Sequence, residues 1–168
     1  KLGCTYVVIG HSERRAIHKE DDALINRKIK AALANELTPI FCVGEELAIR
    51  EAGTHVSHVI RQVRAGLEGF HKPELKKIVI AYEPVWAIGT GKTATPEMAE
   101  ETHAYIRKVL TDMFGADTAE TVRIQYGGSM KGANSAELIA QTDIDGGLVG
   151  GASLEPDSFA ELIKNAVQ

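Results

Sequence analysis

Five short apolar segments alternate with longer stretches of mixed polarity along the chain. Each segment is apolar at nearly every position, a pattern typical of strands that are buried on both faces of a parallel sheet. From this pattern we predict five strands, at residues 5–9, 39–43, 78–82, 122–126 and 147–149.

The stretches between these segments repeat apolar residues at intervals of three and four, as amphipathic helices do. The clearest repeats span residues 21–35 and 96–113. The second repeat has Thr95 as its expected N-cap and Pro96 as its first helical residue. Residues 45–70 are more polar, but they carry an apolar edge that we expect to be buried.

Two further helix starts are indicated near the end of the chain. Asn134 followed by Glu137 resembles a capping box, and Pro156 stands where the first turn of a helix tolerates proline. Strands and helices therefore alternate as five βα units. Because no Ser/Gly-rich linker or charge run divides these units, we predict a single domain over residues 1–168.

An α/β chain of this kind fits two architectures. Five units in 168 residues average roughly 34 residues each, and eight such units would total roughly 270, near the usual size of a (β/α)8 barrel. The chain would then be an incomplete barrel with five consecutive βα units, corresponding to strands 4 to 8. A complete, doubly wound five-stranded sheet of the flavodoxin type fits the strand count equally well.

Composition narrows the possible partners. Nineteen Lys and Arg residues against 23 Asp and Glu residues give a formal net charge of −4. No broad cationic surface is therefore expected for nucleic acid or for an anionic membrane. No apolar run approaches the roughly 20 residues that a membrane helix needs, and the start does not resemble a signal peptide. We expect a soluble, cytoplasmic protein.

The two cysteines and the histidines indicate no disulfide and no metal centre. Cys4 and Cys42 lie in apolar runs and form no CxxC pair, which predicts reduced, buried thiols. His55 and His58 stand three residues apart, but they lack the cysteine or carboxylate partners of a metal site. No cofactor is expected.

The segment AYEPVWAIGTGK, at residues 81–92, carries the clearest chemistry. Glu83 follows a buried strand directly, and a loop with a small glycine-containing tip comes after it. In a barrel this end of the strands is the active-site face, and such a loop could close as a lid over a bound anion. A strand-terminal glutamate paired with a neighbouring cation would give the same local pattern.

This twelve-residue segment closely resembles the lid and catalytic glutamate of the triosephosphate isomerase family, which has the TIM-barrel fold. The resemblance implies that Glu83 moves a proton between adjacent carbons through an enediolate, interconverting dihydroxyacetone phosphate and D-glyceraldehyde 3-phosphate in glycolysis and gluconeogenesis. It also implies that Tyr126 bonds to the closed lid. The remaining lid residues by this resemblance are Pro84, Val85, Trp86, Ala87, Ile88, Thr90, Gly91 and Lys92.

The segment GHSERR, at residues 10–15, matches the same family. An imidazole at the start of a helical turn feels the positive end of the backbone dipoles, which favours its neutral form as a hydrogen-bond donor. The resemblance makes His11 the electrophile that faces the substrate carbonyl, and Glu13 a supporting active-site residue. The Glu-Arg-Arg cluster taken alone could equally be a solvated turn.

Two glycine pairs end the last two predicted strands, in YGGS at residues 126–129 and GGAS at residues 150–153. Paired glycines let backbone N–H groups approach a phosphate closely, and barrels often bind phosphate after strands seven and eight. By resemblance, the phosphate contacts are Gly89, Ser129, Gly150 and Gly151. The segment CVGE, at residues 42–45, also matches, so the resemblance covers essentially the whole chain.

The family also places an asparagine and a lysine after its first strand, which a chain starting at the fourth strand would not contain. We therefore expect little isomerase activity from these 168 residues alone. The full-length family implies a homodimer, and for this chain we expect either the missing segment as a partner or self-association. A noncatalytic phosphate-binding or assembly fragment remains an alternative, as does a flavin-binding flavodoxin-like module.

Overall fold

The computed structural model describes residues 2–90 and 92–167, and its strands form one parallel sheet. The strands are β1 (Tyr6–Ile9), β2 (Thr38–Val43), β3 (Val79–Tyr82), β4 (Ile124–Tyr126) and β5 (Gly146–Gly147). All five predicted strands are therefore present, although β4 and β5 are shorter than expected. The register pairs Ile9 with Phe41, Val43 with Tyr82, and Tyr82 with Tyr126.

The strand order distinguishes the two architectures. The strands lie side by side in the order β1-β2-β3-β4-β5, whereas a doubly wound sheet reverses its direction of winding at a switch point. The flavodoxin-type alternative is therefore wrong, and the α/β fold is a partial (β/α)8 barrel. Within the described residues, β1 and β5 each pair with one strand and form the edges of the sheet.

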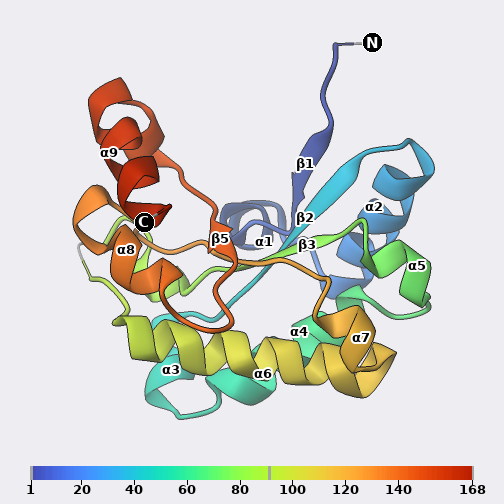
Figure 1. Cartoon of the computed structure of the whole chain (residues 1–168). Helices are drawn as coiled ribbons and strands as arrows, with labels where there is room; N and C mark the ends of the chain where they lie inside the picture. Colours follow the sequence, from blue (N-terminus) through green and yellow to red (C-terminus); the bar gives the residue numbers. More distant parts are fainter. Residues whose placement is uncertain (1, 91, 168) are drawn as a thin grey trace.

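Nine α-helices and two 3-10 turns lie within the described part of the chain (Figure 1). The helices are α1 (Ser12–His18), α2 (Asp22–Ala34), α3 (Leu47–Glu51), α4 (His55–Gly66), α5 (Lys72–Leu75), α6 (Pro96–Phe114), α7 (Ala116–Ala119), α8 (Gly132–Ile139) and α9 (Pro156–Ala166). The turns are η1 (Val85–Ala87) and η2 (Gly151–Ser153). None of these described helices has the length and apolar character needed to cross a membrane.

Three of the predicted helix starts can be compared with the structure. The Thr95 side chain accepts a hydrogen bond from the Met98 N–H at 3.2 Å, so Thr95 is the N-cap of α6 as predicted. Pro156 opens α9, also as predicted. The prediction for Asn134 is wrong: the N-cap of α8 is Lys131, three residues earlier. The Asn134 side chain instead accepts from the backbone N–H of the N-cap Lys131, at 2.8 Å.

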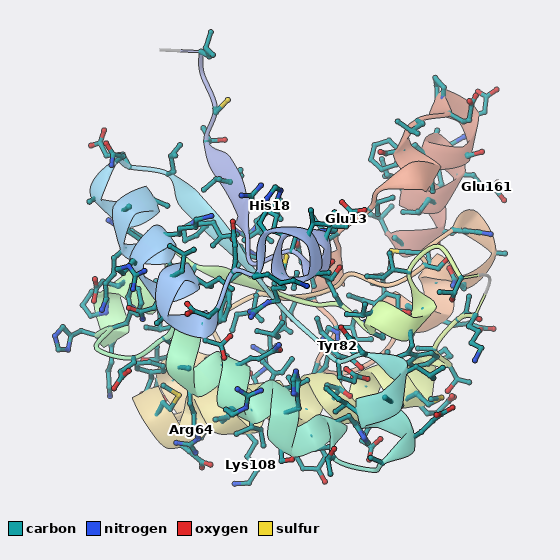
Figure 2. All side chains as sticks on the ribbon, turned by 180° about the vertical axis from the view of Figure 1, so that it is seen from behind. Glu13, His18, Arg64, Tyr82, Lys108 and Glu161 are labelled. Atoms are coloured by element: carbon teal, nitrogen blue, oxygen red, sulfur yellow. The ribbon has the colours of Figure 1, made fainter. Side chains whose placement is uncertain are left out.

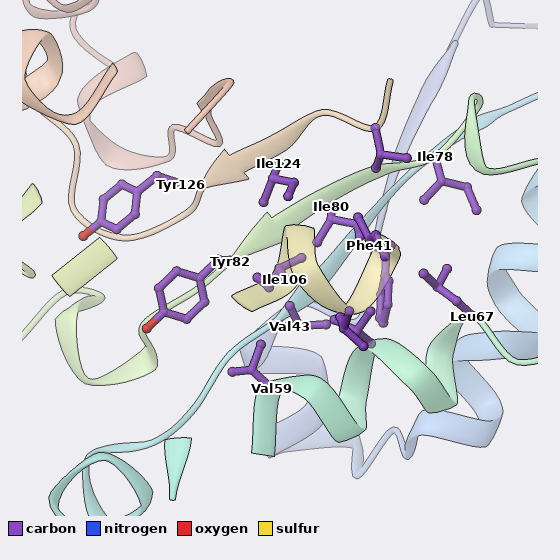
Figure 3. Packing of buried hydrophobic residues seen from close by; sticks show 14 of the residues in the cluster. Phe41, Val43, Val59, Leu67, Ile78, Ile80, Tyr82, Ile106, Ile124 and Tyr126 are labelled. Atoms are coloured by element: carbon purple, nitrogen blue, oxygen red, sulfur yellow. The ribbon is translucent and has the colours of Figure 1, made fainter. Parts of the chain in front are cut away.

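The core lies between the sheet and a layer formed by α2, α4 and α6 (Figure 1). Alternate residues of each strand point into this layer because successive side chains of a strand point to opposite faces. Phe41 and Val43 of β2 thus pack near Val59 and Leu67 of the α4 region (Figure 3). This layer fixes the strand ends that carry the candidate site.

The opposite face of the sheet is unevenly covered. All four residues of β3 are buried, but Tyr6 and Val8 of β1 are 51% and 41% exposed. Burial on both faces was therefore correctly predicted for the central strand and wrongly for β1, an edge strand. The two cysteines differ in the same way: Cys42 of β2 is buried as predicted, whereas Cys4, just before β1, is exposed.

The contact between Gly66 and Phe41 makes the packing of α4 on the sheet testable. A Cβ placed on Gly66 would lie 2.2 Å from Cζ of Phe41, so we expect Gly66→Ala to lower the free energy of unfolding by about 1 to 3 kcal/mol. Urea unfolding followed by circular dichroism measures this change. Adding Phe41→Leu should recover part of the loss, and a Gly66→Ala variant as stable as the parent would contradict the prediction.

Candidate active site

The carboxylate of Glu83 stands immediately after β3, where the backbones of three neighbouring strands come together. The Glu83 N–H donates to the Val43 carbonyl at 2.7 Å. A Cβ on Gly44 would lie 1.7 Å from the Glu83 carbonyl oxygen, and a Cβ on Gly127 would lie 3.0 Å from its Cγ. Glycine at 44 is therefore required by this close approach, and glycine at 127 leaves room for the glutamate side chain.

The Glu83 side chain is 2% exposed and is held by the start of α1. Its Oε2 accepts the Ser12 N–H at 3.0 Å, while its Oε1 accepts the Ser12 hydroxyl at 3.3 Å and lies 2.9 Å from Nε2 of His11. Burial raises the pKa of Glu83 above the ordinary carboxyl value, against the opposing influence of His11 and Ser12. A buried carboxylate with a raised pKa is a stronger base than an exposed one.

The imidazole of His11 has a defined orientation because it caps α1. Its Nδ1 accepts a hydrogen bond from the Glu13 N–H at 3.3 Å. A backbone N–H can only donate, so Nδ1 carries a lone pair and Nε2 carries the proton of the neutral ring. His11 therefore presents an N–H donor toward Glu83.

A cavity of about 950 Å³ brings most of the predicted site residues together. Its walls include His11, Glu83 and residues of the two glycine-rich segments. A Cβ on Gly150 or Gly151 would meet no atom within 4 Å, so the backbone there borders open space. The predicted phosphate contacts that line this cavity are Gly89, Ser129, Gly150 and Gly151.

The predicted lid begins with a 3-10 turn, η1, which a hydrogen bond from Trp86 to Glu45 holds in place. The Trp86 indole N–H donates to Oε1 of Glu45 at 2.9 Å, and the Tyr82 hydroxyl donates to the same oxygen at 3.0 Å. The guanidinium of Arg50 lies 5.7 Å from the centre of the indole ring. The start of the lid is thus held by a buried carboxylate that follows the preceding strand, β2.

The rest of the lid is less enclosed. Pro84 and Ala87 are buried and Ile88 lines the cavity, whereas Gly89 and Thr90 are exposed. The Thr90 hydroxyl donates to the Trp86 carbonyl at 2.7 Å and accepts the Lys92 N–H at 3.2 Å. Val85 lies in η1 and is half-buried, and Gly91 lies outside the described residues.

Tyr126, the predicted partner of the closed lid, ends β4 beside this loop. Its hydroxyl is buried and makes no hydrogen bond to the described residues, although the Ala94 backbone amide faces it outside hydrogen-bonding geometry. Burial raises the pKa of Tyr126 to about 12. A Cβ on Gly128 would lie 2.3 Å from this hydroxyl, so the YGGS segment leaves room for it.

Of the three predicted catalytic residues, Glu13 is the one that does not line this cavity. Its side chain is 77% exposed on α1 (Figure 2), with Oε2 4.0 Å from Nδ1 of His11. It lines a separate hollow of about 620 Å³ together with Arg15 and Asp22. Glu83 borders both spaces, whereas Glu13 borders the second one.

Sequence reasoning gave no role to several residues that shape the site. Ser12 makes two hydrogen bonds to Glu83, and Glu45 accepts a hydrogen bond from Trp86 at the start of the lid. Both residues lie in segments that match the family, but the sequence alone assigned them no role. Gly44 in CVGE and Gly127 in YGGS were likewise visible without a role. Among the described residues, no group of three or more His, Cys, Asp or Glu side chains could hold a metal ion.

Comparison with known proteins agrees with this geometry. The family model described as triosephosphate isomerase matches residues 1–166. The triosephosphate isomerase of Fusobacterium nucleatum is 57% identical over 163 residues, covering 97% of this chain and 65% of the relative. That of Moorella thermoacetica is 60% identical over 162 residues, covering 96% and 65%.

The triosephosphate isomerase of Mycobacterium avium is 58% identical over 162 residues, covering 96% of this chain and 62% of the relative. The chain spans less than two thirds of the length of each of these relatives. A family match over nearly every residue, with identity above one half, leads to one conclusion. This chain belongs to the triosephosphate isomerase family.

Proposed function

We propose that this chain supplies the proton-transfer site of a triosephosphate isomerase, which interconverts dihydroxyacetone phosphate and D-glyceraldehyde 3-phosphate. One observation supports the proposal above all others. The Glu83 carboxylate and Nε2 of His11 lie 2.9 Å apart on the wall of one cavity, which the glycine-rich strand ends also line. The proposal concerns the activity of a whole enzyme of this family, and this chain spans 65% of the length of the Fusobacterium relative.

The chemistry assigns complementary tasks to the two side chains. Glu83 takes a proton from the carbon beside the substrate carbonyl, and the electron pair of that C–H bond moves to give an enediolate. The N–H of His11 donates a hydrogen bond to the oxygen on which negative charge develops. Glu83 then returns the proton to the adjacent carbon, while the proton of the substrate hydroxyl passes to the former carbonyl oxygen, so that the isomer forms and the base is restored.

Backbone groups would hold the phosphate. We assign this contact to Gly89, Ser129, Gly150 and Gly151, because glycine lets N–H groups approach an anion closely. Closure of the lid would bring the Ala94 amide into hydrogen-bonding geometry with the free Tyr126 hydroxyl. A closed lid excludes water and so protects the enediolate from side reactions.

Three further expectations accompany this proposal and rest on the family relationship. We expect the whole enzyme to be cytoplasmic and homodimeric. We also retain Glu13 as a supporting residue that acts through His11, whose Nδ1 lies 4.0 Å from its carboxylate.

The proposed activity predicts a large effect of one substitution. The chain is assayed for isomerisation of D-glyceraldehyde 3-phosphate alone and after mixing with the part of the Moorella enzyme that it does not span. Where turnover is measured, Glu83→Gln should lower kcat by about 100- to 10,000-fold, because the amide cannot accept the proton. Glu68→Gln, which changes an exposed carboxylate beyond the end of α4, is the matched control.

Binding separates the possible outcomes of this assay. Phosphoglycolate, a phosphorylated mimic of the enediolate, is titrated into the same samples. Turnover that survives Glu83→Gln would overturn the proposal. Binding of the mimic with no turnover in either sample would instead favour a noncatalytic phosphate-binding fragment.

The contact between His11 and Glu83 predicts a direction of pKa change. His11 lowers the pKa of Glu83 while burial raises it, so His11→Ala should move the pKa of Glu83 further upward. His11→Gln keeps a donor near the carboxylate and should cause a smaller rise. NMR titration of the 13C-labelled glutamate carboxyl groups measures both changes, and a fall in either variant would contradict this account.

A further inference from the structure

His103 is a fully buried histidine of α6 that the proposed chemistry does not use. Its ring lies between two tyrosine rings from the ends of neighbouring strands. The Tyr82 ring meets it edge-on, with centres 5.7 Å apart and planes at 84°, and the Tyr126 ring lies 6.4 Å away at 35°. The His103 ring therefore packs near the rings of both Tyr82 and Tyr126.

The two tyrosines lie near opposite ends of the lid. The Tyr82 hydroxyl donates to the Glu45 oxygen that also accepts the Trp86 indole N–H, near the start of the lid. The Tyr126 hydroxyl faces the amide of Ala94, just beyond the end of the lid. Figure 3 shows both phenol rings extending in the same direction from the ends of β3 and β4. A displacement of the His103 ring would therefore shift the positions of both phenols.

His103 is itself fixed by the chain that precedes β5. Its Nδ1 donates to the Asp143 carbonyl at 3.0 Å. Two other residues on the same side of α6 bind Asp143: the Glu100 carboxylate accepts its N–H at 3.1 Å, and Arg107 pairs with its carboxylate at 2.9 Å. The imidazole thus has one end anchored and its ring surface free to pack against the tyrosines.

From this arrangement we infer that His103 is a positioning residue for the lid, holding the Tyr82 phenol that supports its start and the Tyr126 phenol that lies near its end. The inference rests on the proposed function only in treating residues 84–92 as a lid. The ring carries out the positioning through its packing against the two phenols, and the hydrogen bond to Asp143 joins it to the segment before β5. Burial lowers the pKa of His103 to about 4, so the ring stays neutral between the two phenols near neutral pH.

Trp86 provides a direct measurement because it is the one tryptophan in the 168-residue sequence. Quenching of its fluorescence by acrylamide reports how freely the start of the lid opens. His103→Asn keeps an N–H donor for the Asp143 carbonyl but removes the ring, and should raise the quenching constant about twofold or more. His103→Phe keeps a ring of similar shape and loses the donor, and should leave the constant near the parent value.

Two further variants complete the design. His18→Asn makes the same exchange at an exposed histidine of α1 and should have no effect. Tyr82→Phe keeps the ring but removes the hydroxyl that reaches Glu45, and should raise quenching as His103→Asn does. Circular dichroism and cooperative urea unfolding establish that each variant is folded, and the unfolded protein gives the fully exposed limit.

The outcomes separate this inference from the proposed function because no step requires turnover or a bound substrate. Quenching that is unchanged in folded His103→Asn would overturn the inference. Equal increases in His103→Asn and His103→Phe would also overturn it, since the bond to Asp143 and not the ring would then matter. If His103→Asn does not fold, the two conservative variants decide: increased quenching in His103→Phe, or none in Tyr82→Phe, contradicts the inference.

Discussion

The candidate site depends on the close approach of three strand ends around Glu83. The Glu83 N–H reaches the Val43 carbonyl on one side, and the Gly127 N–H reaches the Tyr82 carbonyl on the other, each at 2.7 Å. Side chains larger than hydrogen at 44 would collide with the Glu83 backbone. The parallel ladder therefore continues one residue past β3, and it sets the position of the carboxylate through the backbone and not through a flexible loop.

Local patterns were sufficient to predict the elements that carry this ladder. Buried strands such as β3 are apolar at every position, and α6 starts with Thr95 and Pro96 in positions that physical chemistry favours for any sequence. β5 was harder to delimit because its two residues are both glycine and carry no hydrophobic signal. Its identity as a strand comes from pairing with β4, which is a tertiary contact.

The contacts that complete the site lay beyond the sequence for the same reason. Ser12 and Glu83 are separated by 71 positions, and nothing in either local pattern indicates that the serine would donate twice to the glutamate. The exposure of Cys4 and Glu13 likewise depends on what packs beside them. The family resemblance predicted that Glu83 and His11 share one site, and the two side chains lie 2.9 Å apart. It did not identify Ser12 or Glu45, which hold Glu83 and Trp86 in place.

The support beneath the lid shows why polar groups are used there in preference to apolar packing. Glu45 is fully buried, and one of its oxygens accepts hydrogen bonds from both Tyr82 and Trp86. Burying a carboxylate carries a substantial desolvation cost, which hydrogen bonds and the guanidinium of Arg50, 3.6 Å away, offset in part.

Apolar contacts are not directional, so an apolar contact of the same area would hold the Trp86 indole in several orientations about equally well. Hydrogen bonds are directional, so a small rotation of the Trp86 indole changes its bond to Glu45 while the phenol of Tyr82 keeps the carboxylate in place. The ring of His103 lies behind that phenol, and its burial in turn depends on α6 and the segment before β5. Under the proposed function, the barrel layer thereby supports the start of the segment that closes over the substrate.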